Sequence, residues 1–137
     1  MNNLCKMLQS VYNWHDKHIL IIEDDYANYL LFHEILTCAH ACLIRAVSLQ
    51  EAFDMLNSNT RFDLVIMNNS IPGNEYCRSL KRIKILWPHV RILAIAGNDC
   101  DVRLNSCQTT GCDTLISKGI DSFELRTVVN EMLDPVN

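Results

Sequence analysis

In the sequence HILIIEDD at residues 18–25, an apolar run ends directly in three acidic residues. An unbroken run of aliphatic residues is typical of a strand covered on both faces, as in a parallel sheet. Adjacent carboxylates after such a strand repel each other and resist desolvation, so they need a cation nearby. We therefore expect a buried parallel strand with a functional site at its carboxyl end.

Further apolar runs follow along the chain and alternate with amphipathic stretches, a pattern typical of repeated βα units. Ser48 and Glu51 form a capping box that opens one helix, and Asp121 with Glu124 opens another. The predicted strands are residues 18–22, 42–47, 64–67, 90–95 and 114–116.

Apolar residues at helical spacing predict the buried face of each helix. A helix after Asp25 would bury Ala27, Leu31 and Ile35. The faces of the later helices are Ala52, Met55 and Leu56; Tyr76, Leu80, Ile83 and Trp87; and Leu125, Val128, Val129, Met132 and Leu133. A more polar helix is expected over 101–110, with Gly111 as its C-cap.

The N-terminal residues lie outside the alternating pattern. Leu4, Met7, Leu8, Val11 and Trp14 recur at helical spacing, which predicts an extra amphipathic N-terminal helix or linker over residues 1–17. That segment would either cover part of its own domain or pair with another chain. A single α/β domain would then occupy residues 18–134.

Composition narrows the class of protein. A chain of 137 residues with 49% hydrophobic and 20% charged residues has the character of one globular domain. The net charge of -4, without a basic patch, argues against nucleic acid as a partner. Since there is no apolar run of membrane-spanning length and no signal peptide, we expect no membrane contact and a cytoplasmic location.

The seven cysteines are odd in number and lack the paired CxxC spacing of a structural zinc site. Cys38, His40 and Cys42 bring three metal-capable side chains close together, but no second pair matches them. Structural, reduced thiols are the favoured interpretation.

Polar residues that could bind a metal ion or a phosphoryl group follow the predicted strands in a specific order. Glu23 and Asp24 follow the first strand, Asn68 follows the third, and Lys118 follows the fifth. This order and spacing resemble the receiver domain of bacterial two-component response regulators, a resemblance that covers residues 18–134. The motifs that carry it are IIEDD at 21–25, DLVIMN at 63–68 with IP at 71–72, ILAIAG at 92–97 and GCDTLISK at 111–118.

The resemblance implies a flavodoxin-like three-layer α/β sandwich: a five-stranded parallel sheet of order 2-1-3-4-5 with helices on both faces. In the family, a histidine kinase's phosphoryl group passes to an aspartate after the third strand with the help of Mg²⁺. By position, Glu23 and Asp24 match the acidic pair, and Ser70 would supply a backbone carbonyl to the metal. Lys118 matches the lysine that contacts the phosphoryl oxygens, and Asn68 stands at the acceptor position.

The sequence departs from the family where the reaction occurs. The neutral amide of Asn68 cannot attack phosphorus as an aspartate carboxylate does, although it can accept a hydrogen bond from Lys118 and donate to Glu23 or Asp24. The family has two switch residues: a Thr or Ser whose hydroxyl moves to bind the phosphoryl group, and a Phe or Tyr whose ring rotates inward in response. Ala96 stands at the first of these positions and Leu115 at the second. Two further departures are Gly119 for the usual proline and Tyr76 for a glycine.

These departures predict a pseudo-receiver, a non-enzymatic domain that regulates a partner by contact and without phosphorylation. With one carboxylate lost, Mg²⁺ binding by Glu23, Asp24 and the Ser70 carbonyl would be weak or vestigial. We favour a polar cluster retained for folding, with Lys118 as its counter-ion, over a working ligand site. The implied partner is a histidine kinase or another two-component protein, with a homodimer as the alternative.

Two other functions stay open. In the first, the domain is an active, Mg²⁺-dependent receiver that is phosphorylated at Asp25 or Asp99, or at Asn68 after deamidation. In the second, it is a small-molecule-binding or enzymatic flavodoxin-like domain. The second has less support because no Gly-rich phosphate loop follows the first strand. His33 and His40 are also expected to lie far from the strand ends.

Overall fold

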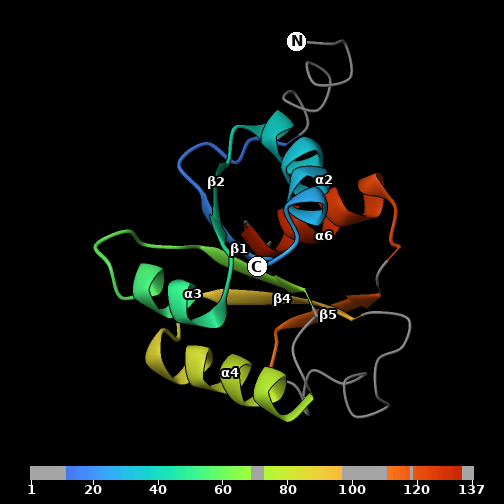
Figure 1. Ribbon diagram of the computed structural model, residues 1–137. Helices are drawn as coiled ribbons and strands as arrows, with labels where there is room; N and C mark the ends of the chain where they lie inside the picture. The colour runs from blue at the N-terminus through green and yellow to red at the C-terminus, as the bar shows by residue number, and fades with distance from the viewer. Residues whose placement is uncertain (1–11, 69–72, 97–110, 118, 134–137) are drawn as a thin grey trace.

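Five strands pair in parallel in the order β2-β1-β3-β4-β5. The computed structural model describes residues 12–68, 73–96, 111–117 and 119–133 (Figure 1). Each predicted strand is confirmed, and no strand end differs from its predicted position by more than one residue. The strands are β1 (His18–Ile22), β2 (Cys42–Ala46), β3 (Leu64–Asn68), β4 (Arg91–Ala96) and β5 (Thr114–Ser117). The order confirms the flavodoxin-like arrangement that the resemblance implied.

The helices form the two outer layers of the sandwich. On one face of the sheet lie α2 (Tyr26–Leu36) and α6 (Ser122–Leu133), and on the other lie α3 (Leu49–Leu56) and α4 (Gly73–Leu86) (Figure 1). A short 3-10 helix, η1 (Thr37–Ala39), follows α2. In the described part of the chain, no helix is both long and apolar enough to cross a membrane.

Alternate residues of β1 supply the two hydrophobic cores. Leu20 and Ile22 pack on the side of α3 and α4, whereas Ile19 and Ile21 pack on the side of α2 and α6. Successive side chains of a strand point to opposite faces of the sheet. Both faces are covered, so the strand needs no polar alternation, which explains the unbroken apolar run that precedes Glu23.

The predicted helix starts are confirmed by side-chain caps. Ser48 Oγ accepts a hydrogen bond of 3.2 Å from the backbone N–H of Glu51 at the start of α3. Asp121 Oδ1 accepts one of 2.8 Å from the N–H of Glu124 at the start of α6. Each cap satisfies a backbone donor that would otherwise lack a partner inside the helix. These caps fix where the helices begin relative to the strand ends.

The predicted buried face of α2 is wrong for Ala27 and Leu31 and right for Ile35. Ala27 and Leu31 are exposed, while the side packed against the sheet carries Tyr29, Phe32 and Leu36, with Ile35 partly buried beside them. Apolar residues surround most of this helix, so a four-residue spacing could be found on more than one side. The predicted face of α6 is confirmed, since Leu125, Val129, Met132 and Leu133 are buried and Val128 is partly buried.

The predicted N-terminal helix over 1–17 is wrong for residues 12–17, which form coil and a turn. Asp16 has a φ of 68°, which a right-handed helix cannot contain. Trp14 is only 1% exposed, and its indole Nε1–H donates to Asn130 Oδ1 of α6 at 2.9 Å. Its apolar character therefore serves to anchor this segment against α6. Residues 1–11 and the predicted helix over 101–110 lie outside the described residues.

Candidate functional site

The ends of β1 and β3 bring two of the predicted site residues together. The two strands pair in parallel with Ile22 opposite Met67, so Glu23 and Asn68 are neighbours at the same edge of the sheet. Asn68 Nδ2 donates to Glu23 Oε1 at 2.6 Å. Glu23 is 1% exposed and Asn68 is 7% exposed, which makes them the buried polar side chains of the described chain. The amide thus satisfies a carboxylate held away from water.

This pair explains how the edge tolerates a buried acid. A carboxylate buried among apolar strands is costly unless it is paired or hydrogen-bonded. The Asn68 amide supplies that donor, and a hydrogen bond to a charged acceptor is stronger than one between neutral groups. An aspartate at position 68 would instead present a second negative charge to Glu23. The neutral Asn68 amide therefore stabilises the buried Glu23 carboxylate without a cation, which two carboxylates at this place would need.

The other two acids of the turn have different roles. Asp24 and Asp25 are both exposed. The side chain of Asp25 caps α2, with Oδ1 accepting from the N–H of Ala27 at 2.8 Å. Glu23 alone of the three is buried with Asn68, and its second oxygen, Oε2, accepts from the N–H of Asp25 at 3.3 Å. Glu23 and Asp24, although adjacent in the sequence, thus differ in burial: Glu23 is buried against Asn68, and Asp24 is exposed.

Arg45 is a part of this edge that sequence reasoning missed. Its Nε donates to the backbone carbonyl of Glu23 and its Nη2 to that of Asp24, each at 3.0 Å. The guanidinium carbon lies 5.2 Å from the centre of the Tyr26 ring and 5.7 Å from that of Tyr29, within cation–π range. A fork-shaped donor can fix two successive carbonyls at once, so Arg45 holds the turn after β1 in place.

A signal for Arg45 was present in the sequence, since a charged residue interrupts the apolar run of β2. The register pairs Arg45 with Ile21, close to the end of β1. Its neighbour Tyr29 is drawn into the same cluster. Burial raises the pKa of the Tyr29 hydroxyl, the nearby Tyr26 adds to this, and Arg45 acts in the opposite direction.

The predicted switch positions lie on β4 and β5. Ala96 ends β4 and pairs with Ser117 of β5, and Leu115 packs partly buried against the core under α3 and α4. Gly119 has a φ of 97°, whereas proline holds φ near -65°. The backbone at 119 therefore accepts glycine and excludes the proline of the family. Lys118, Ser70 and Asp99 lie outside the described residues.

Among the described residues at this edge, the side chains as they are oriented do not form a Mg²⁺ site. Mg²⁺ requires oxygen ligands in octahedral geometry. The group of Asn68 that faces Glu23 is an N–H donor at 2.6 Å, which a cation in that space would repel. Among the described residues, no three His, Cys, Asp or Glu side chains are grouped to hold a metal, and Cys42, the described thiol of the predicted Cys38-His40-Cys42 trio, is free.

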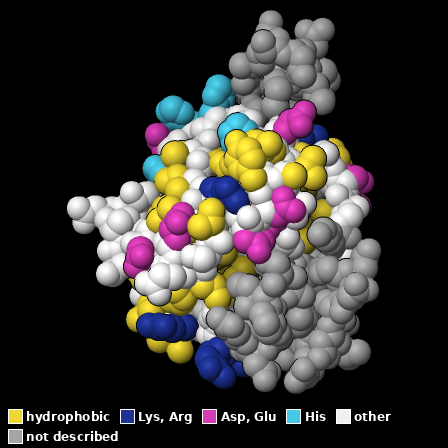
Figure 2. Space-filling view, viewed as in Figure 1, with side chains coloured by type: hydrophobic (Ala, Val, Ile, Leu, Met, Phe, Trp, Pro, Cys, Tyr) yellow, Lys and Arg dark blue, Asp and Glu magenta, His cyan; other side chains and the backbone are white. Residues whose placement is uncertain are grey.

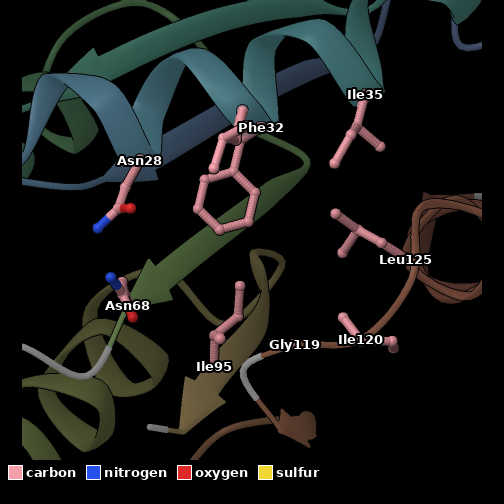
Figure 3. A pocket seen from close by; sticks show the side chains of 9 residues that line it. Asn28, Phe32, Ile35, Asn68, Ile95, Gly119, Ile120 and Leu125 are labelled. Atoms are coloured by element: carbon pink, nitrogen blue, oxygen red, sulfur yellow. The ribbon is translucent and has the colours of Figure 1, made fainter.

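A cavity of about 310 Å³ opens beside Asn68, between α2, α6 and the ends of β3 and β4 (Figure 3). The side chains of Asn28 and Asn68 face each other at one end of it. Sequence reasoning missed this cavity because its lining comes from five separate parts of the chain.

Comparisons with known proteins agree with this architecture. The family model described as the response regulator receiver domain matches residues 19–130. The chain is 27% identical to sporulation initiation phosphotransferase F of Bacillus subtilis over 119 residues, which are 86% of this chain and 94% of that protein. It is also 27% identical to transcription factor SKN7 of Chaetomium thermophilum over 108 residues, 77% of this chain but 14% of that longer protein.

Solved structures show the same fold. A response regulator receiver domain protein from Clostridium thermocellum superposes with a TM-score of 0.76 at 19% identity, covering 86% of this chain and 94% of that one. A CheY-like receiver domain protein from Methanospirillum hungatei gives 0.75 at 24% identity, with the same coverage of both chains. At such identities the likeness establishes the fold alone.

Proposed function

Because the chain belongs to the response regulator receiver domain family, we propose that it works as a pseudo-receiver. In this proposal the domain keeps the receiver shape and regulates a protein partner through direct contact. It takes up no phosphoryl group at position 68. The partner is a histidine kinase or another two-component protein, with a second copy of this chain as the alternative.

The hydrogen bond between Asn68 and Glu23 is the observation that carries the proposal. An amide nitrogen has its lone pair in resonance with the carbonyl and is no nucleophile toward phosphorus. Here Nδ2 is also engaged with Glu23 Oε1 at 2.6 Å, in a buried position. This hydrogen bond supports a structural role for Asn68, which holds the two strand ends together and does not accept a phosphoryl group.

The switch positions support the same conclusion. Ala96 has no hydroxyl group that could move toward a phosphoryl group, and Leu115 has no aromatic ring that could rotate in response. Leu115 packs against the core on the side of α3 and α4. A signal that reached Asn68 would thus find no relay at these positions. We propose that any Mg²⁺ binding by Glu23 and Asp24 is correspondingly weak.

Exposed apolar side chains on α2 support regulation by protein contact. Tyr26 is 58% exposed and Leu31 is 59% exposed, and Leu30 between them is also exposed. Figure 2 shows hydrophobic side chains gathered on the face that carries α2, with acidic residues at their edge. A cluster of exposed apolar side chains with a polar rim is typical of a protein interaction surface.

The test is the intact mass of the protein after incubation with acetyl phosphate and Mg²⁺, in parallel with Asn68→Asp. We expect no adduct on the unaltered chain and one phosphoryl adduct on Asn68→Asp. Asn59→Asp, an exposed change of the same chemistry, is the matched control and should remain unmodified. An adduct on the unaltered chain would overturn the proposal, and peptide mapping would then identify Asp25, Asp99 or a deamidated Asn68 as the acceptor.

A further inference from the structure

The cavity beside Asn68 has the size and the place of a ligand site. Its volume of about 310 Å³ falls at the lower end of the range for small-molecule pockets. It lies outside the carboxyl ends of β3 and β4, where open parallel sheets generally bind their ligands. Figure 3 shows α2 on one side of the cavity and the segment that enters α6 on the other.

Most of the cavity wall is apolar. Phe32 projects from α2 toward Ile95 at the end of β4, and Ile35 faces Leu125 across the far end (Figure 3). Ile120 and Leu31 complete this apolar part. An occupant must therefore carry an apolar body, because a polar body would lose its hydration without gaining hydrogen bonds.

The polar groups meet at one end, where Asn28 and Asn68 face each other. One N–H of Asn68 Nδ2 is used by Glu23 Oε1, which leaves the second N–H and the carbonyl oxygen of Asn68 for a ligand. Asn28 carries both a donor and an acceptor. A head group that both donates and accepts hydrogen bonds matches this pair.

The polar lining favours a neutral head group. Asn28 and Asn68, the polar side chains that line the cavity, are both uncharged amides. Neither an anionic nor a cationic head group would find an opposite charge among these lining side chains to offset the hydration that it loses.

We propose that this cavity binds a small neutral molecule with an apolar body and a primary amide or equivalent head group. The occupant would touch α2, α6 and the end of β3 at once, and so would tie both helices of one face to position 68. The inference concerns the cavity itself and does not depend on the partner contacts proposed above.

The binding test uses phenylbutyramide as the neutral probe and phenylbutyrate as its anionic counterpart, each followed by amide chemical shifts in an NMR titration of the full chain. We expect saturable binding of the amide with a dissociation constant on the order of 1 mM or tighter. The shifts should concentrate on α2, Asn68 and residues 119–125. The carboxylate should bind roughly 10-fold more weakly, because the side chains that line the cavity offer it no cation to offset its lost hydration.

Two variants locate the probe. Ile120→Trp fills the cavity and should weaken amide binding by about 10-fold or more. Asn28→Leu removes a polar partner and should reduce the preference for the amide over the carboxylate by about 5-fold. Ile85→Trp is the matched control, because Ile85 is 78% exposed on α4 at the other face of the sheet; it should bind as the unaltered chain does.

The inference is overturned if the amide shows no saturable binding, if its shifts fall elsewhere, or if Ile120→Trp keeps full affinity with a native amide spectrum. Should Ile120→Trp fail to fold, Asn28→Leu decides, since an unchanged preference between the two probes also overturns the inference. None of these results bears on phosphorylation at Asn68, which the mass measurement tests separately.

Discussion

Asn68 Nδ2 lies 2.6 Å from Glu23 Oε1 and joins the ends of β3 and β1 across 45 residues of sequence. A carboxylate and a neutral amide form a stable buried pair at this distance, whereas two carboxylates need a cation between them. The identity of residue 68 therefore decides whether this edge of the sheet depends on a metal. Substitutions at this edge should therefore change the free energy of unfolding in predictable ways.

The first expectation concerns Asn68→Asp. Replacing the donor with a carboxylate next to buried Glu23 should lower the free energy of unfolding by about 2 kcal/mol at neutral pH without Mg²⁺. Mg²⁺ bound between the two carboxylates should restore most of this loss. Chemical denaturation with and without Mg²⁺ measures the effect. Equal stability of variant and unaltered chain in both conditions would contradict the role assigned to the amide, and exposed Asn59→Asp is the control.

The second expectation concerns Arg45. Arg45→Met removes two hydrogen bonds to the carbonyls of Glu23 and Asp24 together with the stacking on Tyr26, and should cost about 1 to 2 kcal/mol of stability. Arg45→Lys keeps the charge but loses the forked pair of donors, so its stability should lie between that of the unaltered chain and that of Arg45→Met. Denaturation curves compare them with Arg78→Met, an exposed arginine on α4. If Arg45→Met and Arg78→Met were equally mild, Arg45 would not hold the turn.

The third expectation concerns two glycines that share a positive φ. Gly119→Ala should cost about 1 kcal/mol, from backbone strain alone, because nothing lies within 4 Å of the added methyl group. Gly111→Ala should cost more, since its φ is 87° and the methyl group would meet Lys81 Cγ at 2.7 Å. Thermal unfolding gives the order of the two variants. A reversed order would show that contact with Lys81 is relieved at little cost.

The fourth expectation concerns Asp113, which joins β4 to α4. Its Oδ2 accepts from the N–H of Ile92 at 2.7 Å and from Lys84 Nζ at 3.0 Å. Asp113→Ala should lower stability by about 2 kcal/mol, because a backbone donor in the sheet loses its partner. Asp113→Asn keeps one acceptor oxygen and should lose about half as much. Exposed Asp54→Ala should be nearly neutral, and a comparable loss there would contradict the argument.

Much of the fold could be predicted because it depends on local patterns. Apolar runs and caps such as Ser48 and Asp121 report on residues only a few positions apart, and they placed every strand to within one residue. The faces of α3 and α6 followed for the same reason, since one side of each helix is clearly more apolar. On α2 that contrast is missing, and the predicted face through Leu31 was wrong.

Local patterns in the sequence were enough to predict the parallel α/β class, the strand positions, and Glu23 and Asn68 at the ends of strands; the place of Lys118 stays a prediction, because that residue lies outside the described ones. Tertiary packing set which of the described polar groups meet. It buried Glu23 with Asn68, left Asp24 exposed, brought Arg45 to the turn and opened the cavity between α2 and α6. The physical reason is that these contacts join residues far apart in the chain, so they depend on strand register and helix packing, which no local periodicity encodes.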